Sequence, residues 1–309
     1  MILLTYSTGL EGSTPAIFYK PSHHRGVDGT TKDLSSLNFQ PRPTVSQVFG
    51  YVNKRPCPSL GREQSILGAG TLLAFHDLPV LTITEGDRLV GFVARFHLLR
   101  KLLDIKPKDL HRWVLSPVGK IASKKVPVVS QQHELIEVFR VMKKTGFGVA
   151  LVEKGRFFGL ITLEDFLVWI EPQNILNDIP LSSQAVAAPP ETPLLDALRL
   201  MFKLRIRRLL VKEKPAAVSD REIIRYLFSP YGVEQLKSSP ESTLSTPIRE
   251  VGAVDALSAN APLSISQAAN LVLSSPARLV LVNEYVVTPW DVVSAYFERT
   301  LNEKTGLNE

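Results

Sequence analysis

A nine-residue stretch, residues 159–167 (Gly-Leu-Ile-Thr-Leu-Glu-Asp-Phe-Leu), constrains the possible folds of this chain most strongly. Its apolar first residues predict the end of a buried strand. Thr162 then stands where a helix N-cap belongs, and Asp165 follows three residues later, a spacing typical of a capped helix start. We therefore expect a strand that turns directly into a capped helix.

The same pattern recurs along the chain. The four N-cap candidates and their partners three residues later are Ala94/His97, Thr162/Asp165, Ser219/Glu222 and Thr288/Asp291. In the last copy Pro289 fills the first helical position, where a missing N–H is harmless. The outer gaps between N-cap positions are 68 and 69 residues, whereas the middle gap is 57. This spacing indicates four repeats arranged as two modules of two.

Composition limits the class of protein. The chain has 309 residues, of which 44% are hydrophobic and 21% charged, as expected for a soluble protein of two ordinary domains. No apolar run approaches the roughly 18 residues of a membrane span, and residues 1–4 are too short for a signal peptide. The single cysteine, Cys57, cannot form an internal disulfide, so we expect a cytoplasmic protein. The net charge of +6 favours an anionic partner, which is a nucleotide, a nucleic acid or an acidic protein surface.

Composition also varies along the chain. Residues 1–37 are rich in glycine, proline, serine and threonine, and we interpret them as an arm that is flexible or loosely docked. His23 and His24 have no nearby cysteine or carboxylate, so we expect surface residues and no metal site. The predicted modules are residues 38–172 and 173–301, and residues 302–309 form a polar tail.

Each repeat is predicted to contain a strand, a helix, a hairpin and a second helix. The predicted helices are 64–74, 97–103, 133–144, 164–170, 193–202, 264–274 and 290–301. The predicted strands are 78–83, 89–93, 126–129, 149–152, 157–161, 205–211, 278–282 and 286–287. Residues 237–246, which contain several serines and a proline, are expected to form a spacer between the last two repeats.

This order of elements, together with the Gly-apolar-apolar-Thr-x-x-Asp turn, resembles the cystathionine β-synthase (CBS) domain family. The best match lies in the second repeat, at residues 126–128 (Val-Pro-Val), 159–162 and 165–166, and residues 207–211 resemble the family's basic second strand. The resemblance covers about residues 40–300. It implies an α/β (α+β) fold with four CBS repeats, paired into two Bateman modules that form a pseudo-symmetric disc. In this implied arrangement the chain is similar to archaeal homologues of the γ subunit of AMP-activated protein kinase.

The resemblance also implies binding of an adenosyl ligand between paired repeats. In the family an acidic side chain accepts hydrogen bonds from the ribose hydroxyls, while a threonine at a helix start and a basic strand bind phosphate. The resemblance assigns the ribose role to Asp165 and Asp291, the phosphate role to Thr162, Thr288, Arg207, Arg208 and Arg278, and a weaker site to Ser219. We expect the better site in the second module, formed by Thr288, Asp291 and Arg278.

A reading without a ligand stands beside this one. Thr-x-x-Asp at a helix start is also a capping box, and Ser219 with Glu222 is the preferred capping pair. Ala94 and His97 are expected to supply neither a normal cap nor a ribose acceptor. The first module is poorer in basic residues at the equivalent strand starts, which read Phe147-Gly148 and His76-Asp77.

These observations predict a non-catalytic protein. The sequence contains no phosphate loop, no zinc-protease motif and no nucleophile elbow. The main hypothesis is a regulatory protein that binds AMP, ADP or ATP, needs no cofactor or metal, and signals to a protein partner or a second copy of itself, without a membrane. Alternatives are an S-adenosylmethionine-binding CBS protein, a nucleic-acid-associated protein that uses the basic strand 203–214, and a scaffold whose sites are all vestigial.

Overall fold

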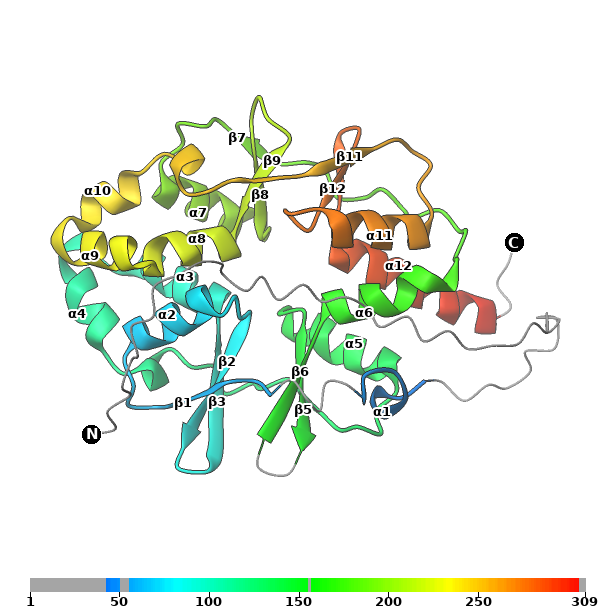
Figure 1. Cartoon of the computed structure of the whole chain (residues 1–309), viewed down its shortest axis with the longest axis horizontal. Coiled ribbons are helices and arrows are strands. Elements are labelled where there is room, and N and C mark those ends of the chain that lie inside the picture. The colour runs from blue at the N-terminus through cyan, green and yellow to red at the C-terminus, as the bar shows by residue number, and fades with distance from the viewer. Residues whose placement is uncertain (1–42, 51–55, 155–156, 306–309) are drawn as a thin grey trace, which may run out of the picture. The chain divides into compact units, whose positions relative to one another are not determined.

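Four small sheets organise the chain, and Figure 1 shows them in two pairs. The computed structural model describes residues 43–50, 56–154 and 157–305. In chain order the strands are β1 (Ser59–Gly61), β2 (Val80–Glu85), β3 (Arg88–Ala94), β4 (Val128–Val129), β5 (Val149–Lys154), β6 (Phe157–Thr162), β7 (Ala187–Ala188), β8 (Arg208–Val211), β9 (Ala216–Ser219), β10 (Val254–Asp255), β11 (Leu257–Ala259), β12 (Val280–Val282) and β13 (Tyr285–Val287).

The helices cover these sheets and connect them. They are α1 (Val45–Val48), α2 (Ile66–Phe75), α3 (Arg95–Asp104), α4 (Leu110–Leu115), α5 (Leu135–Thr145), α6 (Leu163–Ile170), α7 (Leu194–Leu204), α8 (Asp220–Phe228), α9 (Pro230–Ser238), α10 (Pro240–Ser245), α11 (Ile265–Ser274) and α12 (Pro289–Thr305), with short 3-10 helices at Pro107–Asp109, Val118–Lys120, Glu171–Gln173 and Ile248–Glu250. Among the described residues, no helix has the length and apolar character that crossing a bilayer requires.

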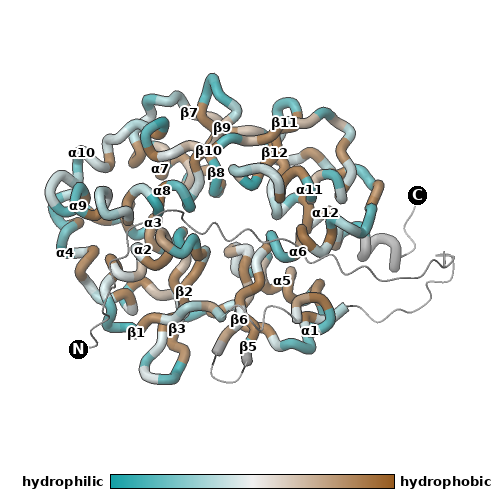
Figure 2. The backbone as a smooth tube through the Cα atoms, viewed as in Figure 1, coloured by the Kyte–Doolittle hydropathy of each residue, from teal (hydrophilic) through white to brown (hydrophobic). Residues whose placement is uncertain are grey.

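Each repeat has the same topology. Its first strand pairs in parallel with the second, which forms an antiparallel hairpin with the third. We number the repeats 1 (59–104), 2 (128–170), 3 (187–228) and 4 (257–305). The predicted order of strand, helix, hairpin and helix is therefore present in all four repeats. Figure 2 shows hydrophobic residues along the strands and hydrophilic ones at the turn between β2 and β3.

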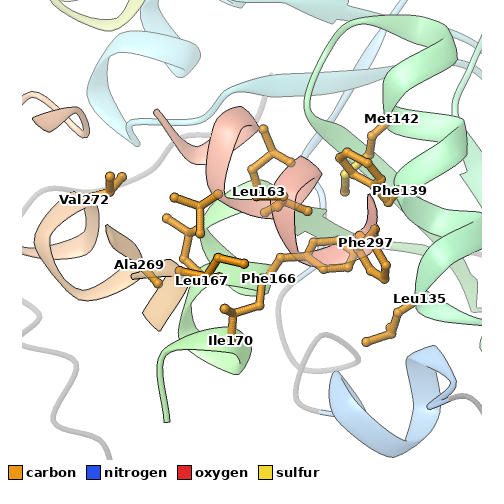
Figure 3. Packing of buried hydrophobic residues seen from close by; sticks show 14 of the residues in the cluster. Leu135, Phe139, Met142, Leu163, Phe166, Leu167, Ile170, Ala269, Val272 and Phe297 are labelled. Carbon is orange, nitrogen blue, oxygen red and sulfur yellow. The ribbon is translucent and has the colours of Figure 1, made fainter. Parts of the chain in front are cut away.

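Two kinds of core hold the repeats together. The sheets of repeats 1 and 2 pack through residues such as Phe92 and Leu151, and those of repeats 3 and 4 pack through Leu210 and Leu279. The helices pack in the other direction, repeat 1 against repeat 3 and repeat 2 against repeat 4. Figure 3 shows the second of these helical cores, where α5, α6, α11 and α12 surround Phe166. Each repeat therefore contacts one neighbour through its sheet and another through its helices.

The chain entering each repeat packs on the partner repeat of its sheet pair. Thr44 forms a bridge with Glu134, and Val45 and Phe49 are buried in the core of repeats 2 and 4. In return, the segment around Pro117 pairs with Ser65 at the start of α2. Thr44 precedes repeat 1 in the chain but lies against repeat 2, where the backbone around it pairs with the turn before α5. In the other sheet pair, equivalent backbone bridges join Asp178 with Ser264 and Pro193 with Pro247.

Three sequence predictions need correction. Residues 237–246 are no spacer, because α9 continues to Ser238 and α10 begins at Pro240. The missed signal was serine followed by proline at a helix start, seen at Ser229-Pro230 and again at Ser239-Pro240. The basic strand predicted from Arg205 starts at Arg208, since Arg205 closes α7 in the left-handed region at φ 57°. Finally, α12 extends to Thr305, into the predicted polar tail.

Several sequence predictions lie outside the described residues. The arm 1–37, including His23 and His24, is one of them, and the end of the tail is another. The module boundaries at 172 and 301 stay predictions. Residues 42–309 form one compact unit, so the predicted boundary at residue 172 lies inside it.

Candidate functional site

The four helix starts share one hydrogen bond. In each, the side chain three residues after the N-cap accepts the backbone N–H of the N-cap residue. The bonds run from Thr162 N to Asp165 Oδ2 (2.7 Å), from Ser219 N to Glu222 Oε2 (3.0 Å), from Thr288 N to Asp291 Oδ2 (2.8 Å) and from Ala94 N to His97 Nδ1 (3.1 Å). The expectation that His97 supplies no cap was wrong, because its ring nitrogen takes the place of the carboxylate. Burial, and then the charge of Arg207, lower the pKa of His97 to about 4, so it accepts this bond as a neutral ring.

Two of the four N-cap residues, Thr162 and Thr288, line a cavity of about 350 Å³. All four repeats contribute to its wall. The polar and aromatic side chains that line it are Arg95, Phe147, Thr162, Glu164, Ser183, Gln184, Arg205, Arg207, Arg208, Asp220, Thr288, Trp290 and Asp291. We call this cavity the Asp291 crevice. Its volume lies within the range of small-molecule sites, roughly 300–1,000 Å³.

Asp291 presents one carboxylate oxygen to the crevice. Oδ2 accepts the N–H of Thr288 and, at 2.6 Å, its hydroxyl. Oδ1 accepts the hydroxyl of Ser183 at 2.9 Å, from the segment that leads into repeat 3. A carboxylate oxygen has about two acceptor positions, so Oδ1 holds one hydrogen bond and has room for a second. The hydroxyl hydrogen of Thr288 is engaged with Asp291, so this threonine offers the crevice lone pairs rather than a donor.

Asp165 has the same motif in different surroundings. Its Oδ2 accepts both the N–H and, at 2.8 Å, the hydroxyl of Thr162. The residue is only 6% exposed, and the described residues that line the two cavities do not include it. The structure therefore brings Thr162 to the Asp291 crevice and keeps Asp165 in the packed start of α6.

The predicted phosphate-binding arginines divide into separate roles. Arg207 donates from its two Nη groups to the carbonyls of Gly146 and Phe147, and its guanidinium lies over the ring of Phe96. Burial lowers the pKa of Arg207. Arg208 donates only its Nε, to the carbonyl of Ala277 at 3.1 Å. Within the described chain its two Nη groups have no other partner, which makes Arg208 the better placed of the two to bind an anion.

A second cavity of about 430 Å³ adjoins the first, and the two share the polar residues Arg95, Thr162, Glu164, Arg208 and Asp220. Its remaining polar wall consists of His76, Asp77, Ser219, Arg221, Glu222 and Arg278. We call it the Asp77 crevice. Arg278 lies here with Ser219 and not with Thr288 and Asp291, so the expected grouping of Arg278 with Asp291 was wrong. In packed sheet pairs, the helix start of one repeat faces the second strand of its partner.

Sequence reasoning missed several residues of these crevices. Ser183 lies in an irregular segment. Its backbone is held by strand β13 of repeat 4, because Val286 N donates to the carbonyl of Ser183 at 2.8 Å. Asp77 is held by Arg95, Arg221 and Arg225 from three positions on two repeats. No local motif marks such long-range ion pairs. Among the described residues, no group of three or more histidine, cysteine or acidic side chains is placed to hold a metal ion.

Comparison with known proteins agrees with this architecture. The family described as CBS domain matches residues 118–172 and 176–229. The chain therefore contains CBS domains within residues 118–229, and its four sheets share one topology. Its particular arrangement matches protein MJ1225 from Methanocaldococcus jannaschii, described as an archaeal homologue of the AMP-activated protein kinase γ subunit. That match has a TM-score of 0.70 at 16% identity, covers 81% of this chain and 99% of MJ1225, and confirms the predicted four-repeat α/β fold.

Two further relatives are more partial. The uncharacterized protein MJ0188 from the same organism is 24% identical over 113 residues, which cover 35% of this chain and 43% of MJ0188. The CBS domain protein PAE2072 from Pyrobaculum aerophilum, solved in complex with AMP, is 19% identical. The match covers 37% of this chain and 86% of PAE2072 with a TM-score of 0.32. This similarity is too low to assign AMP to the present chain.

Proposed function

We propose that this chain is a non-catalytic regulatory protein that binds an adenine nucleotide in the Asp291 crevice. The observation that carries the proposal is a cavity of about 350 Å³ in which the carboxylate of Asp291 and the guanidinium of Arg208 face the same space. A ribose diol would donate to Oδ1 of Asp291, at its open acceptor position and at the one that Ser183 holds. Arg208 and the exposed Arg205 would bind the phosphates.

The proposed signal follows from the origin of the crevice walls. Pro79 belongs to repeat 1, Gly148 to repeat 2, Arg208 to repeat 3 and Thr288 to repeat 4. A nucleotide bound there contacts all four repeats, so it stabilises those arrangements that bind it better. We propose that a protein partner or a second copy of the chain reads this change, with no chemical step on the nucleotide.

Isothermal titration calorimetry with AMP, ADP, ATP and S-adenosylmethionine tests the proposal. We expect one adenine nucleotide to bind the wild-type protein, and S-adenosylmethionine to bind more weakly because it lacks phosphates for Arg208. Tighter binding of S-adenosylmethionine would favour the alternative adenosyl ligand. No heat with any of the four, on protein shown to be folded by circular dichroism, would leave a scaffold with vestigial sites.

The nucleic-acid hypothesis has less support. It relied on the basic strand at residues 203–214, but β8 is largely buried, and Arg207 and Arg208 donate to carbonyl groups of other repeats. These two side chains are therefore not part of an open basic surface. Binding of DNA or RNA with a steep salt dependence would restore the hypothesis.

A further inference from the structure

Asp77 occupies an unusual backbone position. It follows α2 in the left-handed region at φ 53°, and the next residue, Leu78, donates its N–H to the carbonyl of Leu73 to close the helix. The corresponding position after α5 is Gly146, at φ 73°. Glycine suits this conformation best, while aspartate is among the few other residues that adopt it readily. The backbone conformation alone therefore does not explain why this position holds an aspartate. The contacts of its carboxylate do.

The carboxylate of Asp77 is the centre of a cluster of three arginines. Arg95 Nη2 lies 2.6 Å from Oδ1, Arg221 Nε lies 2.8 Å from Oδ1, and Arg225 Nη2 lies 3.1 Å from Oδ2. Arg95 begins α3 of repeat 1, whereas Arg221 and Arg225 lie one turn apart on α8 of repeat 3. The carboxylate of Asp77 thus pairs with three arginines, and it joins repeats 1 and 3, which also meet through apolar helices and through Arg207 over the ring of Phe96.

This cluster lies on a cavity wall and is not sealed inside the core. Asp77, Arg95 and Arg221 all line the Asp77 crevice of about 430 Å³. The side chain of Arg95 is 11% exposed and that of Asp77 35%. Nε of Arg95 is buried and has no hydrogen-bond partner within the described part of the chain. Burial acts to lower the pKa of Arg221, but the hydrogen bonds and charge of Asp77, together with the charges of Glu222 and Glu164, raise that pKa overall.

We infer that Arg95, Arg221 and Arg225 form an oxyanion-binding site that the chain fills with its own carboxylate, Asp77. A phosphate-bearing ligand enters this site only by displacing Asp77. Three convergent guanidinium groups have more donors than one carboxylate has acceptor positions, and a phosphate supplies more oxygens and more negative charge. The inference goes beyond nucleotide binding in the Asp291 crevice, because it concerns other residues and requires no adenosine.

Removal of the internal carboxylate tests this inference directly. The variants are Asp77→Ala and the isosteric Asp77→Asn, and the probe is inorganic phosphate, with pyrophosphate as a second anion. Calorimetry should show at least tenfold tighter phosphate binding by Asp77→Ala than by the wild type. Phosphate should also raise the melting temperature of the variant more than that of the wild type. The added substitution Arg221→Gln should abolish both gains.

A matched control separates this effect from general loss of an acid. Asp196 also pairs with an arginine, Arg199 at 2.9 Å, but it lies exposed on α7, and Arg199 is its one ionic partner among the described residues. Asp196→Ala should therefore gain no phosphate binding. The inference is overturned if folded Asp77 variants bind phosphate no better than the wild type, or if Arg221→Gln leaves the gain intact. It is equally overturned if both variants fail to fold with and without phosphate, because phosphate should then replace the missing charge.

Discussion

The Thr162–Asp165 and Thr288–Asp291 motifs are alike in sequence and in local structure, yet they face different surroundings. In both, one carboxylate oxygen accepts the N–H and the hydroxyl of the threonine. Asp165 is 6% exposed at the start of a helix packed into the core of repeats 2 and 4. Asp291 directs its second oxygen to Ser183 at the wall of a cavity.

The comparison shows that the motif by itself specifies a helix cap. Whether its carboxylate also binds a ligand depends on the residues opposite the helix start, which come from other repeats. Thr162 reaches the crevices, but Asp165 lies next to the packed side chain of Phe166, whose ring lies 5.2 Å from that of Phe49. The start of α12 faces an irregular segment and two arginines.

The largest expected effect tests the packed side of this comparison. Phe166, next to Asp165, is fully buried between Phe49 and Phe297. Phe166→Ala should lower the free energy of unfolding by about 3–5 kcal/mol, because it removes apolar contacts and leaves a cavity. Nucleotide affinity of the remaining folded protein should stay within about twofold of the wild type.

Urea denaturation measures the loss, and Val168→Ala is the matched control on the same helix. Val168 is 51% exposed, so its truncation should change the free energy of unfolding by less than about 0.5 kcal/mol. Equal effects of the two substitutions would contradict the assignment of α6 to the core.

His97 extends the comparison to a cap that titrates. Its pKa is lowered from 6.5 to about 4, first by burial and then by Arg207, so the unfolded chain binds this proton more tightly than the folded one. The stabilising contribution of neutral His97 is full above pH 6.5 and is lost as the pH falls from 6.5 to 4. By linkage the loss is at most about 3 kcal/mol.

The measurement compares urea unfolding of the wild type and His97→Gln between pH 4 and 7.5. The glutamine variant should lose less stability on acidification, because the titrating group is gone while a side chain that accepts the N–H of Ala94 remains. Parallel pH profiles would show that His97 titrates normally in the folded protein.

The open side of the comparison is tested by Asp291→Ala against Asp165→Ala. Loss of the carboxylate in the Asp291 crevice should weaken nucleotide binding tenfold to a hundredfold, about 1.5–3 kcal/mol, since hydrogen bonds to charged groups contribute on this scale. Asp165→Ala should leave affinity within about twofold. Each variant should also lose about 1 kcal/mol of stability with its cap. Calorimetry on the two variants, at equal concentrations of folded protein, measures the affinities. Equal losses of affinity would place both acids in ligand sites.

The sequence predicted the repeats because their signals are local. Strand, turn, N-cap and helix follow within a few residues, so Thr162 and Thr288 were found at the correct helix starts. The partners across the crevices were not predictable in this way. Arg278 was grouped with Asp291 because both belong to repeat 4, but sheet pairing brings Arg278 to Ser219. Asp77 meets Arg221 across 144 residues, a contact that depends on helix packing between repeats 1 and 3.

The smallest expected effect sharpens the comparison at a single hydrogen bond. Ser183 holds one acceptor position on Oδ1 of Asp291 at the wall of the crevice. Ser183→Ala removes a donor that competes with the ribose, so nucleotide affinity should rise a few-fold, below about 1 kcal/mol. Ser182→Ala, at the exposed neighbouring position, should change nothing. If Ser183→Ala weakens binding instead, the serine holds Asp291 in place for the ligand, and the open position on Oδ1 suffices for the ribose.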